Sequence, residues 1–143
     1  MTTLSKVMFV LHRQLERDSI EVCKLGLCEV RLMNNKCFPW LLLIPQVKDA
    51  SEWIDLSRKQ QHQMSDDIMV ASHVLQALVT PDKLNIATLG NQVSQLHVHL
   101  IARYKTDAAW PNPVWGGAQA AYEDKEREQF CYELRSAFSA VGF

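Results

Sequence analysis

The segment QLHVHLIARYKTDAAWPNPVWG, residues 95–116, decides how the rest of the sequence is interpreted. Aliphatic residues surround His97 and His99, and side chains two positions apart in a β-strand point to the same face. The alternation therefore predicts a strand over residues 95–103 that buries an aliphatic face. The other face of this strand presents Gln95 and the two histidines.

The composition is that of one packed domain, which we take to span residues 1–143. The chain is 48% hydrophobic and 22% charged, as in ordinary globular domains. Its 15 basic and 16 acidic residues give a net charge of −1, whereas binding to long nucleic acid requires a basic stripe. We therefore expect no nucleic-acid partner, although a small phosphorylated ligand is compatible with this charge.

The sequence predicts a cytoplasmic protein with no membrane association. Residues 7–11 form a short apolar run that is followed at once by charge, unlike a secretory signal. No apolar stretch approaches the roughly 20 residues that span a bilayer. The four cysteines show no CxxC pairing, which favours reduced, partly buried thiols. They are Cys23, Cys28, Cys37 and Cys131.

Apolar periodicity and turn residues predict an α+β domain. The expected strands cover residues 19–23, 27–33, 40–44, 83–88 and 95–103, and the expected helices cover residues 7–17, 57–79 and 123–140. Ser57 and Gln60 form a capping box at the start of the long helix, and Pro81 ends it. The short link around Gly90 cannot make a parallel crossover. We therefore expect an antiparallel sheet of about five strands, with a long helix and a C-terminal helix on it.

Two imidazoles on one face of a strand can bind and attack a phosphate. They would lie about 6.5 to 7 Å apart along the strand, a span that fits a phosphate between them. Histidine changes its charge near neutral pH. One ring could therefore be neutral and nucleophilic while the other is protonated and stabilises negative charge.

The same spacing leaves other interpretations open. A metal site would need further ligands, and no acidic residue lies between Asn85 and Tyr104. Cys23 and Cys28 could form a zinc site with the histidines, although buried thiols explain them better. The histidines could also be half-exposed side chains on an edge strand.

The surrounding sequence resembles the histidine-triad (HIT) superfamily, and especially a bacterial branch of proteins described as diadenosine-tetraphosphate-hydrolase-like. The family motif is His-φ-His-φ-His-φ-φ, where φ is apolar; residues 95–101, QLHVHLI, match all four apolar positions and two histidines. The similarity extends to LMNNKCFPWLLLIP (32–45), LNIATLGN (84–91) and AWPNPVWG (109–116). The resemblance covers residues 9 to 117 and implies a HIT-like fold, a nucleotide substrate and a homodimer, with helix 57–79 contributing to the interface.

The resemblance assigns a role to each motif position. His97 stands where the family has the nucleophile that attacks the α-phosphorus and forms a nucleotidyl-histidine. His99 stands where the last histidine contacts the phosphate. Gln95 replaces the first histidine, whose backbone carbonyl orients the nucleophile. A Gln amide can donate to a phosphate oxygen but carries no proton at neutral pH, so we interpret the change as tuning of rate or substrate.

The resemblance also suggests substrate-binding positions. Asn91, Gln92 and Ser94 would contact phosphate after the glycine turn, Asn34 would contact the ribose, and Asn85 would face the phosphates. The base would lie against leucines of the early strands, with Leu27 as the main candidate beside Leu25 and Leu32, although these could be plain core. Trp110 and Trp115 either form a wall of the site or pack a rigid loop on the body of the protein.

The sequence thus predicts a HIT-family hydrolase or nucleotidyl transferase. Its substrate would be a nucleoside phosphate, a phosphoramidate or a dinucleoside polyphosphate. The alternative is a non-catalytic nucleotide-binding or regulatory module on the same fold. We expect no cofactor and no protein-bound metal, although Mg²⁺ can accompany a polyphosphate substrate.

Overall fold

The computed structural model describes residues 8–143, so Val7, where the first predicted helix begins, lies outside them. The elements are α2 (Arg13–Asp18), β1 (Ser19–Lys24), β2 (Cys28–Met33), β3 (Trp40–Pro45), the 3₁₀ helix η1 (Trp53–Asp55), α3 (Arg58–Val79), β4 (Lys83–Ala87), β5 (Val98–Arg103) and α4 (Asp124–Ala140). This arrangement confirms the predicted α+β class.

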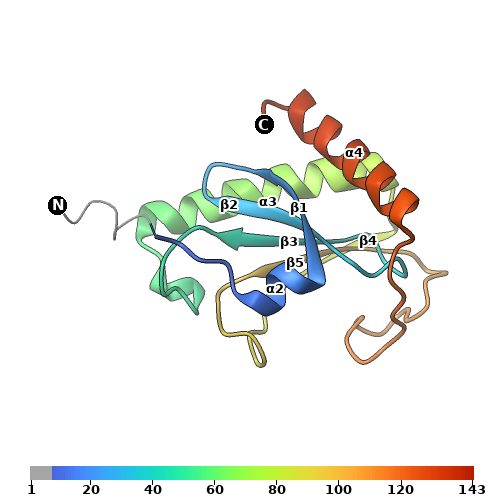
Figure 1. The fold of residues 1–143 in the computed structure, drawn as a ribbon, viewed down its shortest axis with the longest axis horizontal. Coiled ribbons are helices and arrows are strands. Elements are labelled where there is room, and N and C mark those ends of the chain that lie inside the picture. Colours follow the sequence, from blue (N-terminus) through green and yellow to red (C-terminus); the bar gives the residue numbers. More distant parts are fainter. Residues whose placement is uncertain (1–7) are drawn as a thin grey trace.

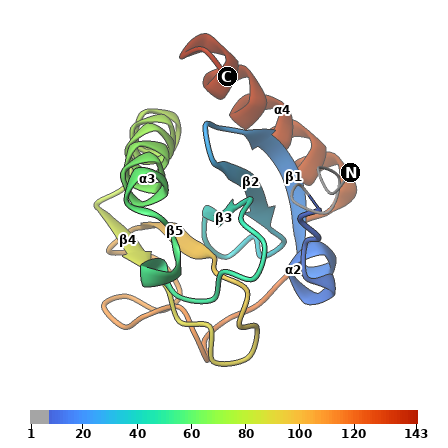
Figure 2. The same cartoon turned by 90° about the vertical axis from the view of Figure 1, so that its left-hand side faces the viewer.

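The strands form one five-stranded sheet in the order β1-β2-β3-β5-β4, and every neighbouring pair is antiparallel. Helices α3 and α4 cover one face of the sheet, while α2 and the long loops lie on the other (Figures 1 and 2). After β4 the chain turns at Gly90, and β5 returns antiparallel to β4, as the short link predicts. The sheet therefore separates a helix-covered face from a loop-covered face.

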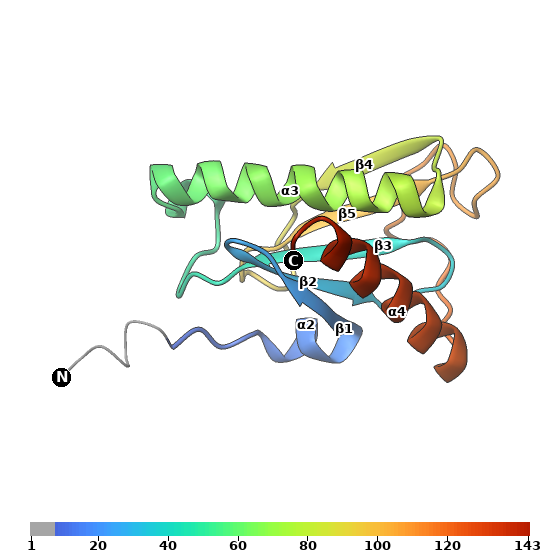
Figure 3. The same ribbon diagram turned by 90° about the horizontal axis from the view of Figure 1, so that it is seen from above.

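The larger core lies between the sheet and the two long helices. Figure 3 shows α3 running along the sheet with α4 beside it. The apolar stripe of α3 is buried there, at Met64, Ile68, Ala71 and Leu75. Burying each large aliphatic side chain contributes about 1.5–3 kcal/mol. This face gives the fold most of its apolar burial and leaves the other face available for a site.

β3 is buried on both faces, as its continuous apolar run predicts. Leu41 and Leu43 join the core under α3, whereas Trp40, Leu42 and Ile44 belong to a second, smaller cluster on the loop face. The second cluster also takes in residues from α2, β5 and the loop after β5. Its small size leaves room for a cavity above the middle of the sheet.

Local sequence signals define the ends of α3. The Ser57 hydroxyl accepts from the Gln60 backbone N–H at 3.1 Å, and the Gln60 side chain accepts from the Ser57 N–H at 2.8 Å. Thr80 adopts a left-handed conformation just before Pro81, which cannot continue a helix.

In the part of the chain that the structure describes, no helix is both long and apolar enough to cross a membrane.

Two elements begin several residues later than the sequence predicts. The first helix begins at Arg13 instead of residue 7, because residues 10 and 12 hydrogen-bond through their backbones to Gln95 and the His12 side chain caps the helix. The last strand begins at Val98 instead of residue 95, because the Leu96 N–H donates to the Ala50 carbonyl and not to a neighbouring strand. In both cases a tertiary contact decides where the element starts.

Candidate active site

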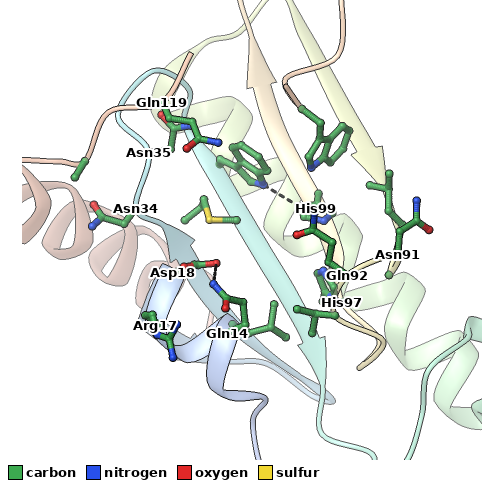
Figure 4. Close-up of a pocket in the computed structure, with 18 of the residues that line it drawn as sticks. Gln14, Arg17, Asp18, Asn34, Asn35, Asn91, Gln92, His97, His99 and Gln119 are labelled. Atoms are coloured by element: carbon green, nitrogen blue, oxygen red, sulfur yellow. Dashed lines mark hydrogen bonds between the residues drawn. The ribbon is translucent and has the colours of Figure 1, made fainter. Parts of the chain in front are cut away.

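A cavity of about 800 Å³ lies on the loop face of the sheet. We call it the histidine pocket (Figure 4). It is bounded by α2, the end of β2, the turn before β5 and the segment that follows β5. The residues that line it are Gln14, Leu15, Arg17, Asp18, Met33, Asn34, Asn35, Trp40, Leu89, Gly90, Asn91, Gln92, Val93, His97, His99, Trp115, Gln119, Ala120 and Ala121.

His97 is 6% exposed and lines the histidine pocket just before β5. Its Nδ1 lies 2.6 Å from the Gln95 carbonyl oxygen, which can only accept a hydrogen bond. Nδ1 therefore carries the proton and Nε2 carries a lone pair. Burial lowers the pKa of His97, and the nearby charge of His12 lowers it further, against an opposing effect of the Gln95 carbonyl. The ring is a neutral base with its nucleophilic nitrogen unprotonated.

His99 is also 6% exposed and lies beside His97, with ring centroids 5.0 Å apart. Its Nδ1 accepts a hydrogen bond of 3.0 Å from the indole Nε1–H of Trp40. The Trp115 ring packs edge-on against it with a centroid distance of 5.0 Å. Burial lowers the pKa of His99 to about 3, and His97 adds to this effect.

The structure corrects one electrostatic expectation. The sequence suggested one neutral and one protonated imidazole, but both rings are neutral at neutral pH because both are removed from water. His99 can stabilise a phosphate by donating a hydrogen bond from its Nε2–H. It does not supply a full positive charge.

Gln95 contributes its backbone to the site and directs its side chain elsewhere. The side-chain Oε1 accepts from the His12 N–H at 2.8 Å, and Nε2 donates to the Val10 carbonyl at 2.9 Å. Both groups of the carboxamide thus bind the extended segment that precedes α2. Gln95 is not among the described residues that line the pocket, so its amide is not placed to meet a phosphate there as the sequence suggested.

Removing the Gln95 side chain tests this attachment. Gln95→Ala should loosen residues 8–18, because two hydrogen bonds worth about 0.5–1.5 kcal/mol each are lost. Hydrogen–deuterium exchange of peptides from this segment should accelerate, while peptides from α3 stay protected. Ser94→Ala, an exposed neighbour, is the matched control. Unchanged exchange at residues 8–18 would show that another contact fixes the segment.

Three predicted substrate-binding residues line the histidine pocket, namely Asn34, Asn91 and Gln92. The turn that carries the last two depends on Gly90, whose φ of +75° favours glycine. The Asn34 side-chain oxygen accepts from the Tyr122 N–H at 3.1 Å. This bond leaves the Asn34 amide N–H groups as donors at the pocket wall.

Three other predicted positions lie outside the pocket. Ser94 is exposed and does not line it. Asn85 is directed to Arg103, whose Nη1 donates to its Oδ1 at 2.8 Å. Leu27 packs on the core under α3, on the opposite face of the sheet. Leu25 and Leu32 belong to that same core, so none of the three leucines can line a base pocket.

The apolar wall comes instead from Leu15 and Met33. Strand alternation could have indicated Met33, because its neighbour Leu32 points into the helix-side core. No sequence pattern indicated that the polar residues of α2 would line the pocket. Gln14, Arg17 and Asp18 reach the pocket only because α2 packs beside β1, and Gln14 donates to Asp18 at 2.8 Å.

The loop after β5 is fastened by Arg103, which is 2% exposed. Its guanidinium donates to both carboxylate oxygens of Asp107 (2.8 and 3.1 Å), to Asn85 and to the Asn112 carbonyl (both 2.8 Å). It also lies 5.9 Å from the centroid of Trp110. Trp110 therefore packs the loop on the body of the protein, while Trp115 from the same loop lines the pocket.

The metal interpretation requires several ligands that converge on one point. Among residues 8–143, no three His, Cys, Asp or Glu side chains gather closely enough to hold a metal ion. All four cysteines are free. Burial raises the pKa of Cys23 to about 11, which disfavours the thiolate that binds metals.

Comparisons with known proteins agree with the fold. The HIT domain family matches residues 14–106, which is more than half of the chain. A histidine triad protein from Bradyrhizobium japonicum is 44% identical, with a TM-score of 0.88 over 91% of this chain and 98% of that one. A histidine triad protein from Marinobacter aquaeolei VT8 is 35% identical, with a TM-score of 0.90 over 94% and 99%. The chain belongs to the HIT domain family.

More distant likenesses are limited to the fold. Diadenosine triphosphate hydrolase from Plasmodium falciparum is 16% identical, with a TM-score of 0.62 over 94% of this chain and 85% of that one. A comparison with curated protein sequences found no match.

Proposed function

We propose that this protein is a nucleotide hydrolase or nucleotidyl transferase that acts through a nucleotidyl-His97 intermediate. Its substrates would be nucleoside phosphates, phosphoramidates or dinucleoside polyphosphates. The observation that supports this most is the 2.6 Å contact between His97 Nδ1 and the Gln95 carbonyl oxygen. The Gln95 carbonyl holds the proton at Nδ1 and so leaves the Nε2 lone pair free for an attack on phosphorus.

The first step would be an attack of Nε2 on the α-phosphorus, after which the leaving group departs. The nucleotidylated ring then carries a positive charge, and the Gln95 carbonyl stabilises it by accepting from Nδ1–H. The Nε2–H of His99 and the amide groups of Asn91 and Gln92 are suitable donors to the phosphoryl oxygens. Water would then attack the phosphorus and release His97.

The pocket also suits the rest of a nucleotide. Leu15 and Met33 offer an apolar wall, and Asn34 lies close to it with amide donors. A cavity of about 800 Å³ lies in the size range of small-molecule sites. Mg²⁺ could accompany a polyphosphate chain as part of the substrate.

The decisive experiment mixes the protein with a radiolabelled dinucleoside polyphosphate and, separately, with an adenosine phosphoramidate. We expect AMP release and transient, acid-labile labelling of the protein at His97. A nucleotide that binds without release or labelling would favour the non-catalytic nucleotide-binding module instead.

The pH profile gives a second test. Because burial lowers the pKa of His97, Nε2 keeps its lone pair at pH values where an ordinary imidazole is already protonated. kcat/KM for a substrate whose charge is constant should therefore stay level as pH falls from 8 to about 6.5, the ordinary histidine value. It should decline only at lower pH. An acidic limb centred at or above that ordinary value would contradict a buried, neutral His97.

We also propose a homodimer. Two exposed apolar side chains support it, namely Ile86 on the edge strand β4 and Met69 on α3, 46% and 48% exposed. Light scattering with size-exclusion chromatography tests this directly. A monomer at micromolar concentration would argue against it.

A further inference from the structure

The hydrogen bond between Trp40 and His99 fixes the protonation state of His99. An indole N–H can only donate, so the Nδ1 atom that lies 3.0 Å away must hold a lone pair. In the neutral ring the proton then sits on Nε2. A protonated ring would direct Nδ1–H against the indole N–H, so that two donors would face each other in a buried place.

The surroundings of His99 offer little to stabilise a charged ring. Trp40 from β3 and Trp115 from the loop after β5 pack against it, and His97 lies beside it. Its neighbours across the sheet are Leu42 and Ala87. Burial correspondingly keeps the pKa of His99 low.

The charged groups that line the pocket belong to α2. Within residues 8–143 they are Arg17 and Asp18, and Figure 4 places both on the wall opposite His99. Asp18 accepts the hydrogen bond from the Gln14 amide. No carboxylate in this lining therefore faces His99.

The other motif positions cannot supply a proton either. Nε2 of His97 is the nucleophile, and its Nδ1–H is committed to the Gln95 carbonyl. The Gln95 carboxamide has no acidic proton and is bound to residues 10 and 12. The three positions of the motif thus offer one lone pair and one neutral N–H donor, but no acid.

We propose that Trp40 is a positioning residue that holds His99 as a neutral Nε2–H donor, so that the site favours leaving groups that depart as stable oxyanions over amines. This inference rests on the proposed function. The lone pair of His97 bonds to the phosphorus, and the bond from phosphorus to the leaving oxygen breaks with its electron pair on that oxygen. Water then attacks phosphorus, the electron pair of the P–N bond returns to His97, and the proton of the water passes to solvent.

An amine cannot leave in the same way, because it must be protonated before the P–N bond breaks. General acid catalysis contributes typically about 10²–10⁴-fold. The protein should therefore turn over the 4-nitrophenyl ester of AMP at least about 100-fold faster than the morpholidate of AMP. Equal kcat/KM values for these two probes would overturn the leaving-group preference, because kcat/KM reports the step in which the leaving group departs.

Trp40→Phe removes the indole N–H and keeps an aromatic ring, whereas Trp115→Phe is the matched control that changes the other ring on His99. Ring ¹⁵N spectra report the tautomer directly. We expect His99 of the parent and of Trp115→Phe to be protonated on Nε2 alone. In Trp40→Phe, Nδ1 can gain a proton, so the pKa of His99 should rise. The ratio of kcat/KM for the 4-nitrophenyl ester to kcat/KM for the morpholidate should then fall about 10-fold or more as the pH is lowered.

The outcomes separate the two proposals. A parent spectrum with Nδ1 protonated, or a Trp40→Phe variant with an unchanged ratio and unchanged His99 titration, would overturn the role of Trp40. The parent spectrum decides even if Trp40→Phe does not fold. If neither probe releases AMP or labels His97, the proposed function fails, whereas the spectrum still tests the tautomer.

Discussion

His97→Ala should abolish nucleotidyl labelling of the protein and lower the rate of AMP release by more than about 10⁴-fold, the scale seen when a nucleophile is removed. The reason is that, among the described residues that line the histidine pocket, no other ring nitrogen is free and unprotonated for attack. His99 uses its lone pair to accept from Trp40, so in the proposed mechanism it can offer the substrate only an N–H. Nucleotide affinity should fall far less, because the amide donors and the apolar wall remain. Labelling, turnover and equilibrium binding are measured on the same preparation.

His73→Ala is the matched control for this variant. His73 is exposed on α3, which lies on the other side of the sheet. Its removal should leave labelling and turnover as in the parent. The fold should survive in His97→Ala as well, since the side chain makes one hydrogen bond, worth about 1 kcal/mol. Substantial turnover by a folded His97→Ala protein would overturn the assigned nucleophile.

Arg103→Leu should lower the free energy of unfolding by about 3–5 kcal/mol. The substitution leaves Asp107 as a buried charge without its ion-pair partner, and the Asn112 carbonyl loses its donor. The loop that carries Trp115 should loosen with it. Urea unfolding gives the stability change, and KM for a nucleotide substrate reports the effect on the pocket.

Acid conditions supply the control for this prediction. The Arg103 hydrogen bonds hold the pKa of Asp107 well below its usual value, and backbone N–H groups of Tyr104, Ala109 and Trp110 contribute. A lowered carboxyl pKa stabilises the folded state above the unfolded value of about 3.9, and this stability is lost as the pH falls through the folded value. The difference between parent and variant should therefore shrink in acid. A cost below about 1 kcal/mol at neutral pH would show that the network is dispensable.

Periodicity made much of the fold predictable. The apolar stripe of α3 and the capping box at Ser57 and Gln60 depend on spacing within one helix. The doubly buried β3 follows from its continuous apolar run. Alternation around His97 indicated which side chains share a face, even though β5 begins at Val98, just after His97.

The site was predictable only in part, because several of its contacts join distant segments. Gln95 and His12 are 83 positions apart, and Trp40 and His99 are 59 apart. No local pattern reports such pairs. The leucines predicted for the base pocket illustrate the same limit. The pattern shows that Leu27 is buried, but it does not show which face of the sheet Leu27 packs on.

The sequence by itself determined the elements, the antiparallel return of β5 and the pairing of His97 with His99 on one face, because these depend on residues close together in the chain. The tertiary structure decided which ring nitrogens carry protons, where the Gln95 amide goes and which α2 residues reach the pocket. Those properties arise from removal of water and from hydrogen bonds between segments that meet only when the chain folds.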